Sequence, residues 1–148
     1  MIPVSKLAAV ALALVFAGLA GTARAEDQEQ IQIAQKQPFG KYLSADEGRA
    51  VYLFTADSRD KSTCQGACAQ AWPPVTTSRK PEADAGVNTS MLGTIARQDG
   101  TRQVTYNGIP LYYFVQDKKP GSTKGENIKG FGGEWYLVSP KGKKIDQD

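Results

Sequence analysis

The stretch "LGTIARQDGTRQVTYNGIPLYYF", residues 92–114, contains three runs rich in apolar and β-branched residues, separated by two turn signals. Asp99-Gly100 and Asn107-Gly108 are dipeptides that supply the positive φ angles of a tight hairpin turn. Pro110 cannot donate a hydrogen bond to a neighbouring strand, so we expect it at a strand start or on a sheet edge. The stretch therefore predicts a three-stranded antiparallel meander.

The end of this stretch has a counterpart earlier in the chain. At a constant offset of 60, residues 108–123, "GIPLYYFVQDKKPGST", align with residues 48–63, which end in "VYLFTADSRDKST". After a shift of three residues, a second tryptophan and a valine also align. Such self-similarity is typical of a duplicated structural unit. We expect two repeats, residues 42–76 and 102–139, which share the aligned pairs Tyr52 and Tyr112, Phe54 and Phe114, Asp57 and Asp117, and Trp72 and Trp135.

We expect the shared residues to pack in the core of the protein, and ligand binding is the alternative. Residues i and i+2 of a strand point to the same face, so Tyr52 and Phe54 should pack together. The tryptophans are large apolar groups for a core, and ligand stacking is the alternative. Asp57 follows the expected strand end, where an aspartate can fix a turn by bonding the backbone. A site made of Asp57 and Asp117 together is the remote alternative.

The rest of the chain also favours β structure. Residues 41–54 predict a hairpin around "ADEG", "EWYLVSP" predicts a last strand, and residues 78–90 a polar loop. One short helical turn is expected near residues 65–72. The predicted fold is all-β, a mostly antiparallel sandwich or small barrel made of the two pseudo-repeats.

The beginning of the chain has the pattern of a secretory signal peptide. Lys6 precedes a short apolar run, and small residues precede a cleavage site expected after Ala25. Thr22 stands where a lipidated cysteine would be, so no lipid anchor is expected. Residues 26–38 are expected as a polar leader or an edge strand, and residues 39–148 as a single β domain. These features predict a periplasmic or secreted protein without a transmembrane segment in its mature chain.

Composition excludes several function classes. The formal net charge is +3, and without the signal peptide it comes from 16 basic and 15 acidic residues, which gives no reason to expect a nucleic-acid partner. Histidine is absent, which rules out Ser-His-Asp and Cys-His catalysis within the chain. An enzyme is therefore not the favoured class, and no cofactor is expected.

Cys64 and Cys68, in "STCQGACAQAWPP", are the chain's two cysteines. Residues four apart on one helical turn can reach the Cα separation of a disulfide, and export favours oxidation. Structural zinc requires four ligands, which the chain does not offer from cysteine and histidine. Copper is the weaker alternative, with Met91 as a third soft ligand for Cu(I). We expect a stabilising disulfide, with thiol or copper chemistry as the alternative.

The last third of the chain is basic. Seven lysines against two glutamates lie between residues 118 and 144, and they could face an anionic partner. A solvated charged surface is the alternative. This candidate anionic-partner patch consists of Lys118, Lys119, Lys124, Lys129, Lys141, Lys143 and Lys144.

The segments "YLFTAD", "STCQGACAQAWPP", "DGTRQVTYNGIPLYYF" and "GGEWYLVSP" together resemble the secreted repeat family of predicted lipoproteins, which has a Y-x-(F/W/Y)-x-x-D motif. The resemblance implies a bacterial, exported protein built of tandem repeats. It implies no activity, so no catalytic residue can be transferred. We therefore expect an exported, non-catalytic module that binds an envelope protein or an anionic surface component. The alternative is an envelope thiol or copper-handling redox protein.

Overall fold

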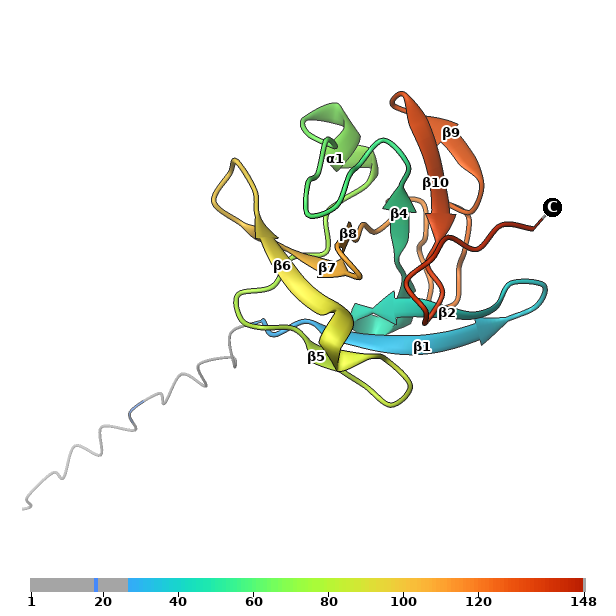
Figure 1. Cartoon of the computed structure of the whole chain (residues 1–148), viewed down its shortest axis with the longest axis horizontal. Helices are drawn as coiled ribbons and strands as arrows, with labels where there is room; N and C mark the ends of the chain where they lie inside the picture. Colours follow the sequence, from blue (N-terminus) through green and yellow to red (C-terminus); the bar gives the residue numbers. More distant parts are fainter. Residues whose placement is uncertain (1–17, 19–26, 148) are drawn as a thin grey trace, which may run out of the picture.

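The computed structural model describes residue 18 and residues 27–147. The expected cleavage site and, apart from residue 18, the expected signal peptide lie outside these residues. The described residues form three small sheets and one short α-helix, α1 (Ala67–Ala71). Figure 1 shows the sheets around a shared interior and the helix at the periphery. The helix confirms the helical turn expected near residues 65–72. Within the described part of the chain, no helix combines the length and apolar character needed to cross a membrane.

The first sheet has the strand order β3-β2-β1-β5. Its strands are β1 (Gln30–Lys36), β2 (Gly40–Ala45), β3 (Arg49–Ala50) and β5 (Glu82–Ala83). β1 and β2 form an antiparallel hairpin, and the two-residue β5 pairs parallel to the start of β1. A 3-10 turn, η1 (Asp46–Gly48), links β2 to β3. The segment that the sequence allows as a polar leader or an edge strand therefore contains a strand flanked on both sides.

The expected meander forms the second sheet, ordered β6-β7-β8. Its strands are β6 (Leu92–Ala96), β7 (Arg102–Tyr106) and β8 (Ile109–Pro110), preceded by the 3-10 turn η2 (Thr89–Met91). Asn107 and Gly108 have φ of 53° and 73° and form the two-residue turn between β7 and β8. Pro110 lies on the edge strand, as expected.

The turn between β6 and β7 is longer than its Asp99-Gly100 signal suggests. Five residues, 97–101, separate the two strands. Asp99 accepts hydrogen bonds from both the backbone N–H and the hydroxyl of Thr101, at 2.9 and 2.6 Å. The Arg97 N–H donates to the Thr101 carbonyl at 2.8 Å and the Gly100 N–H donates to the Arg97 carbonyl at 3.0 Å, so the turn already begins at Arg97.

The third sheet has the order β4-β10-β9, with β4 (Tyr52–Phe54), β9 (Ile128–Gly130) and β10 (Gly133–Leu137). β10 corresponds to the expected last strand, whereas β9 lies in a Gly-rich segment that has no strand signal in the sequence. All ladders except β1 with β5 are antiparallel. This confirms the all-β, mostly antiparallel fold. The sheets of the described residues do not close into a barrel.

Alternate residues of the central segments are buried in two different clusters. Leu53 and Tyr113 belong to an aliphatic-rich cluster, whereas their neighbours Tyr52 and Tyr112 belong to an aromatic one that also contains both cysteines. Successive strand residues point to opposite faces. Both faces of these segments are therefore covered, and the aromatic cluster lies where the two repeats meet.

Candidate functional site

The two motif tyrosines mark the contact between the repeats. Tyr52 N–H donates to the Tyr112 carbonyl at 2.8 Å, and Tyr112 N–H donates back to the Tyr52 carbonyl at 3.0 Å. Their side chains reach across in the same reciprocal way: the Tyr52 hydroxyl donates to Asp117 and the Tyr112 hydroxyl donates to Asp57, each at 2.6 Å. Each motif tyrosine thus bonds the motif aspartate of the other repeat.

The strand pairing around each tryptophan follows the same register in both halves. Thr55 N–H donates to the Glu134 carbonyl at 2.9 Å, and Val115 N–H donates to the Ala71 carbonyl at 3.0 Å. The donors differ by 60 positions and the acceptors by 63, the same offsets that align the two sequences. The aromatic strand of each repeat therefore pairs with the tryptophan segment of the other, and the repeats interlock.

Four motif rings form one continuous stack. Trp72 and Trp135 are parallel at a centroid distance of 4.0 Å, and each is stacked at 4.1 Å on the phenylalanine of the opposite repeat, Phe114 and Phe54. Trp72 is 2% exposed and Trp135 is fully buried. These side chains have no open ring face for a ligand, which favours the core role expected for them.

The motif aspartates have most of their acceptor positions filled. Asp57 also accepts from the backbone N–H and hydroxyl of Thr63, at 2.8 and 2.9 Å. Asp117 accepts from the Ser122 hydroxyl and the Lys124 N–H, each at 2.9 Å. These bonds close the loop that follows each aromatic strand.

Burial changes the pKa values of Asp57 and of its hydrogen-bond donor Tyr112. Burial raises the pKa of Asp57 above its ordinary value, although the hydrogen bonds from Tyr112 and Thr63 act in the opposite direction. Burial, followed by the bond to Asp57, raises the pKa of Tyr112. The pair is therefore arranged as a neutral phenol that donates to a carboxylate, which suits a structural bond.

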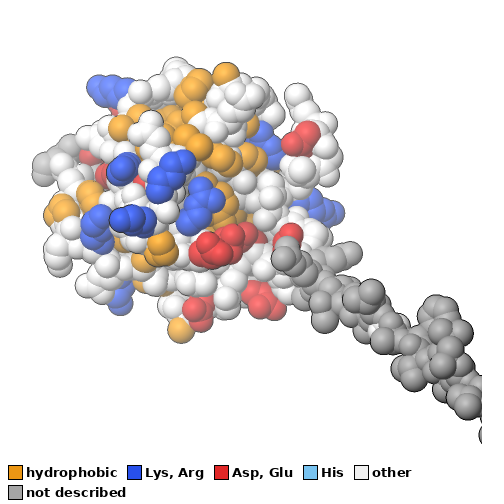
Figure 2. Space-filling model, turned by 180° about the vertical axis from the view of Figure 1, so that it is seen from behind, with side chains coloured by type: hydrophobic (Ala, Val, Ile, Leu, Met, Phe, Trp, Pro, Cys, Tyr) orange, Lys and Arg blue, Asp and Glu red, His pale blue; other side chains and the backbone are white. Residues whose placement is uncertain are grey.

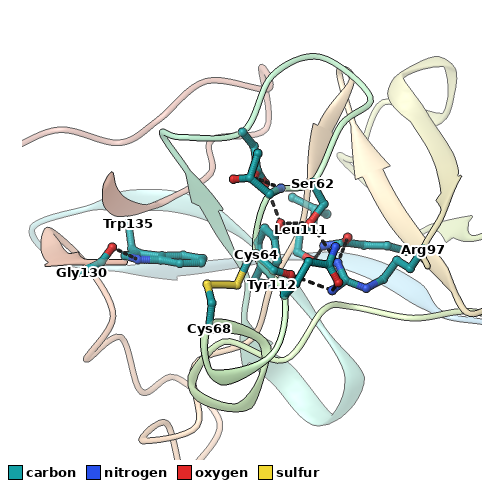
Figure 3. Close-up of a disulfide and its surroundings, with 12 residues drawn as sticks. Ser62, Cys64, Cys68, Arg97, Leu111, Tyr112, Gly130 and Trp135 are labelled. Atoms are coloured by element: carbon teal, nitrogen blue, oxygen red, sulfur yellow. Dashed lines mark hydrogen bonds between the residues drawn. A yellow bond between two sulfur atoms is a disulfide. The ribbon is translucent and has the colours of Figure 1, made fainter. Parts of the chain in front are cut away.

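The cysteines lie beside this network, as Figure 3 shows. Cys64 and Cys68 are joined by a disulfide with a Cα separation of 5.2 Å, and they are 0% and 6% exposed. Met91, the third ligand of the copper alternative, packs instead against the aliphatic-rich cluster. The structure therefore does not bring the three sulfur atoms together.

Arg97 is a polar core residue that the sequence interpretation missed. It is 8% exposed, and its guanidinium donates to the Ser62 hydroxyl at 2.9 Å and to the Cys64 carbonyl at 2.7 Å (Figure 3). Ser62 in turn is 2.6 Å from the Tyr112 hydroxyl. Arg97 therefore ties the cysteine loop to the Tyr112–Asp57 pair. The first repeat has one additional residue in the turn that follows its hairpin, so the strand registers align the hairpins of the two repeats at an offset of 61, and Lys36 takes the position of Arg97. Both residues are basic, which is the signal that could have identified Arg97.

The lysines of the candidate anionic-partner patch are only partly brought together. Lys118, Lys119 and Lys124 line one hollow of about 390 Å³ with Lys36, which the sequence did not indicate. The Lys36 ammonium donates to the Gly121 carbonyl at 3.0 Å and lies 3.3 Å from the Thr123 hydroxyl. We call this hollow the lysine hollow.

The remaining patch lysines do not line the hollow. Lys129 lies 3.7 Å from the carboxylate of Glu134, and Lys144 lies 2.6 Å from that of Asp146. Lys141 and Lys143 are exposed near the C-terminal end. Three of the seven expected lysines therefore line the hollow together with Lys36, and the other four lie outside it.

Comparison with known proteins agrees with the duplication. The sequence model of a family described as a secreted repeat of unknown function matches residues 34–76 and 93–139. Each match includes the motif tyrosine, phenylalanine and tryptophan of its repeat. The first match begins within β1 and the second within β6, so each also covers the hairpin that precedes the motif. No match was found among curated proteins or among solved structures.

Proposed function

Because the chain belongs to the family of secreted repeats of unknown function, we propose that it is an exported, non-catalytic module that binds an anionic envelope component. The binding site is the lysine hollow of Lys36, Lys118, Lys119 and Lys124. The observation that carries this proposal is a difference between the two repeats in the loop after the motif aspartate.

The two loops have the same anchor but different charges. Residues 58–64 contain two basic residues and one acidic residue, a net charge of +1, whereas residues 118–124 contain three lysines and no acid, a net charge of +3. Asp57 and Asp117 each accept a backbone N–H of their loop, from Thr63 and from Lys124 respectively. The first loop has Ser58 and Cys64 where the second has Lys118 and Lys124, so the fold does not require lysine at these two positions.

The two loops also differ at the position of Cys64. The aligned residue of the second repeat is Lys124, so a buried disulfide partner is replaced by an exposed cation. Like charges that are gathered in one place destabilise a folded chain by mutual repulsion. A function in ligand binding accounts for keeping Lys118, Lys119 and Lys124 together.

The hollow suits a multivalent anion. Lysine ammonium groups bind phosphate as point charges with rotatable donors. No Asp or Glu lines the lysine hollow, and Figure 2 shows blue basic side chains gathered over one face. A phosphate-bearing lipid or glycan of the envelope is the chemical class that fits these features.

The test compares binding of the purified mature chain to vesicles of phosphatidylglycerol and of phosphatidylcholine, at low and at high salt. Each lysine near an anionic surface contributes about 1 kcal/mol. The triple variant Lys118→Gln, Lys119→Gln and Lys124→Gln should therefore bind phosphatidylglycerol roughly 10- to 100-fold more weakly at low salt. Inorganic pyrophosphate as a competitor separates a lipid-specific site from a general phosphate site.

The matched control is the double variant Lys141→Gln and Lys143→Gln, which removes exposed lysines outside the hollow. It should bind almost as the parent protein does. Equal losses in the two variants would indicate non-specific attraction and would contradict the proposal, as would binding that does not depend on vesicle charge.

Export has its own test. We propose that the mature chain begins at Glu26 and carries no lipid, because Ala25 ends a signal-peptidase pattern and Thr22 replaces the lipidated cysteine. The protein should be released by osmotic shock, with the intact mass of residues 26–148. An acylated mass, or retention of residues 1–25, would overturn this part.

A further inference from the structure

A second pocket, which is acidic, shares no lining residue with the lysine hollow, although Glu47 of this pocket and Lys118 and Lys119 of the lysine hollow line an intervening hollow together. It has a volume of about 480 Å³ and its lining includes Asp27, Glu29, Asp46, Glu47 and Tyr113. No lysine or arginine lines it, and none of its four carboxylates forms a salt bridge with a residue among 27–147. Figure 2 shows acidic side chains on the same face as the basic group.

Tyr113 is the buried residue of this lining. Its side chain is 8% exposed, and its hydroxyl is shielded from solvent and lies beside Glu29 and Asp46, without a well-aligned hydrogen bond to any residue among 27–147. Burial, followed by the charges of Glu29 and Asp46, raises the pKa of this phenol. The Tyr113 hydroxyl therefore lies close to these two carboxylates and remains protonated. A buried hydroxyl without a good hydrogen bond destabilises the fold, because its bonds to water are lost and not replaced.

The other repeat shows that the fold does not need this hydroxyl. The residue that aligns with Tyr113 is Leu53, which is also 8% exposed and belongs to the same core cluster. An aliphatic side chain thus fills the equivalent place without any polar atom. The buried Tyr113 hydroxyl is a cost that packing alone does not explain.

The acids also lack counterparts in the second repeat. Glu47 and Gly48 have φ of 54° and 77°, as Asn107 and Gly108 have 53° and 73°, so Glu47 occupies the asparagine position of the turn. Asp46 is an additional residue of the first turn, because three residues join β2 to β3 where two join β7 to β8. Asparagine tolerates positive φ better than glutamate does.

One carboxylate is already held in place by the backbone. The Asp46 N–H donates to Glu29 Oε1 at 3.0 Å. The nearby cations lie outside the lining. The Arg49 guanidinium lies over the Tyr113 ring, 4.2 Å from the centroid, and Arg49, Lys118 and Lys119 line the neighbouring hollow with Glu47. With these three cations counted against the four carboxylates, the pocket retains an excess of negative charge.

From the buried Tyr113 hydroxyl and the four carboxylates that form no salt bridge with a residue among 27–147, we propose that the acidic pocket binds an organic cation, namely a primary ammonium or guanidinium group. Such a group donates several N–H bonds, and the phenol oxygen and the carboxylates can accept them. Within residues 27–147, no three acidic side chains are arranged to hold a metal ion. An organic cation, whose donors reach separate acceptors, fits this arrangement better.

The experiment titrates the full mature chain with agmatine, and separately with the peptide acetyl-Gly-Arg-Gly-amide, followed by NMR chemical shifts and calorimetry. The parent protein should bind at least one of them saturably, and more weakly at high salt. Agmatine binding alone indicates a free small cation, whereas stronger peptide binding indicates an arginine side chain of a partner.

Two variants each remove a polar group of the pocket that is absent from the equivalent position of the opposite repeat. Tyr113→Phe removes the hydroxyl, and Glu47→Asn introduces the residue found at position 107. Both should unfold at the same temperature as the parent or higher, yet bind the cation about 5- to 10-fold more weakly, the loss expected for a charge-assisted contact. Side chains with a purely structural role would not show unchanged or higher thermal stability together with weaker cation binding when they are replaced.

Asp60→Asn is the matched control, because Asp60 is also an exposed acid at positive φ, 56°, but lies outside the pocket. It should bind as the parent does. The triple lysine variant should also keep cation binding, which separates this pocket from the lysine hollow. Unchanged binding by Tyr113→Phe and Glu47→Asn, or no saturable binding of either probe up to about 10 mM, would overturn the proposal.

Discussion

Tyr52 and Tyr112 exchange both backbone hydrogen bonds, at 2.8 and 3.0 Å, so the pseudo-twofold relation between the repeats passes between these two residues. On both sides of this pair the two repeats make equivalent contacts. These are the hydrogen bonds to Asp117 and Asp57 and the stacking of the two tryptophans. Neither repeat can complete its pairing alone. Duplication has therefore produced one interlocked unit.

The first prediction compares Tyr52→Phe with Tyr112→Phe. Tyr52 donates to Asp117, which is 4% exposed, and also accepts from the buried Gly125 N–H at 3.2 Å. Tyr112 donates to the half-buried Asp57, where water can replace the lost donor. We expect Tyr52→Phe to cost about 1.5–3 kcal/mol and Tyr112→Phe about 1 kcal/mol.

Urea unfolding measures this difference as a shift of the midpoint at unchanged slope. Asp117→Asn in combination with Tyr52→Phe provides the double-mutant cycle that isolates the pair. If Tyr112→Phe proved the more damaging change, the burial of the acceptor would not control the strength of these bonds.

The second prediction concerns the ring stack. Trp72→Ala removes the ring between Trp135 and Phe114, and truncation of a buried large aromatic residue costs about 3–5 kcal/mol. The control is Phe131→Ala, because Phe131 is 51% exposed and a surface substitution usually changes stability by less than about 0.5 kcal/mol. Thermal unfolding and near-ultraviolet circular dichroism follow both. Similar losses in the two variants would contradict the central role of the stack.

The third prediction is a pH dependence at Glu126. Its carboxylate accepts from the Leu137 N–H at 2.6 Å, and burial raises its pKa to about 7. The raised value means that the folded state binds the proton more tightly than the unfolded chain does. The contribution of Glu126 to stability should therefore fall as the pH rises from about 4.5 towards 7.

Glu126→Gln keeps an acceptor for the Leu137 N–H and removes the charge. The stability difference between the parent and this variant should change across that pH window and stay constant above about pH 8. The effect is modest, because the side chain is only half buried and solvent screens its charge. A difference that does not vary with pH would show that burial does not shift this carboxyl.

Local signals predicted much of the fold. The Asn107-Gly108 turn, the short helix and the shared faces of Tyr52 with Phe54 depend on neighbouring residues, and these predictions are confirmed. The stacking of Trp72 on Trp135 was beyond prediction, because it depends on how the repeats interlock. An alignment offset relates equivalent residues but does not say which of them touch.

The charged groups show the same limit. The lysines at positions 118, 119 and 124 were predicted as one patch with four others, because closeness in sequence was the only guide. Lys36 joins the hollow through tertiary packing, and it corresponds to Arg97 in the second repeat. Extending the comparison of the repeats to their first strands would have drawn attention to both residues.

The last prediction concerns the disulfide. Cys64 and Cys68 enclose only five residues, counting both cysteines, so the chain-entropy model gives about 2 kcal/mol of stabilisation. For a domain of this size, that corresponds to roughly 4–12 °C in melting temperature. The second repeat has Lys124 and Ile128 at the aligned positions, so the repeat forms without the bridge. Changing both cysteines to alanine should therefore preserve the fold and lower the melting temperature by this amount.

Circular dichroism and the melting curve measure that outcome, with Ala67→Gly as a control for disturbance of α1 alone. Exported protein should carry no thiol that an alkylating reagent can modify, because both sulfur atoms are bonded and Cys64 is fully buried. Both soft-metal binding and thiol reactivity require the reduced pair. Stoichiometric Cu(I) bound by the exported protein, and lost in the double alanine variant, would show that the bridge opens and would replace the stabilising role with copper handling.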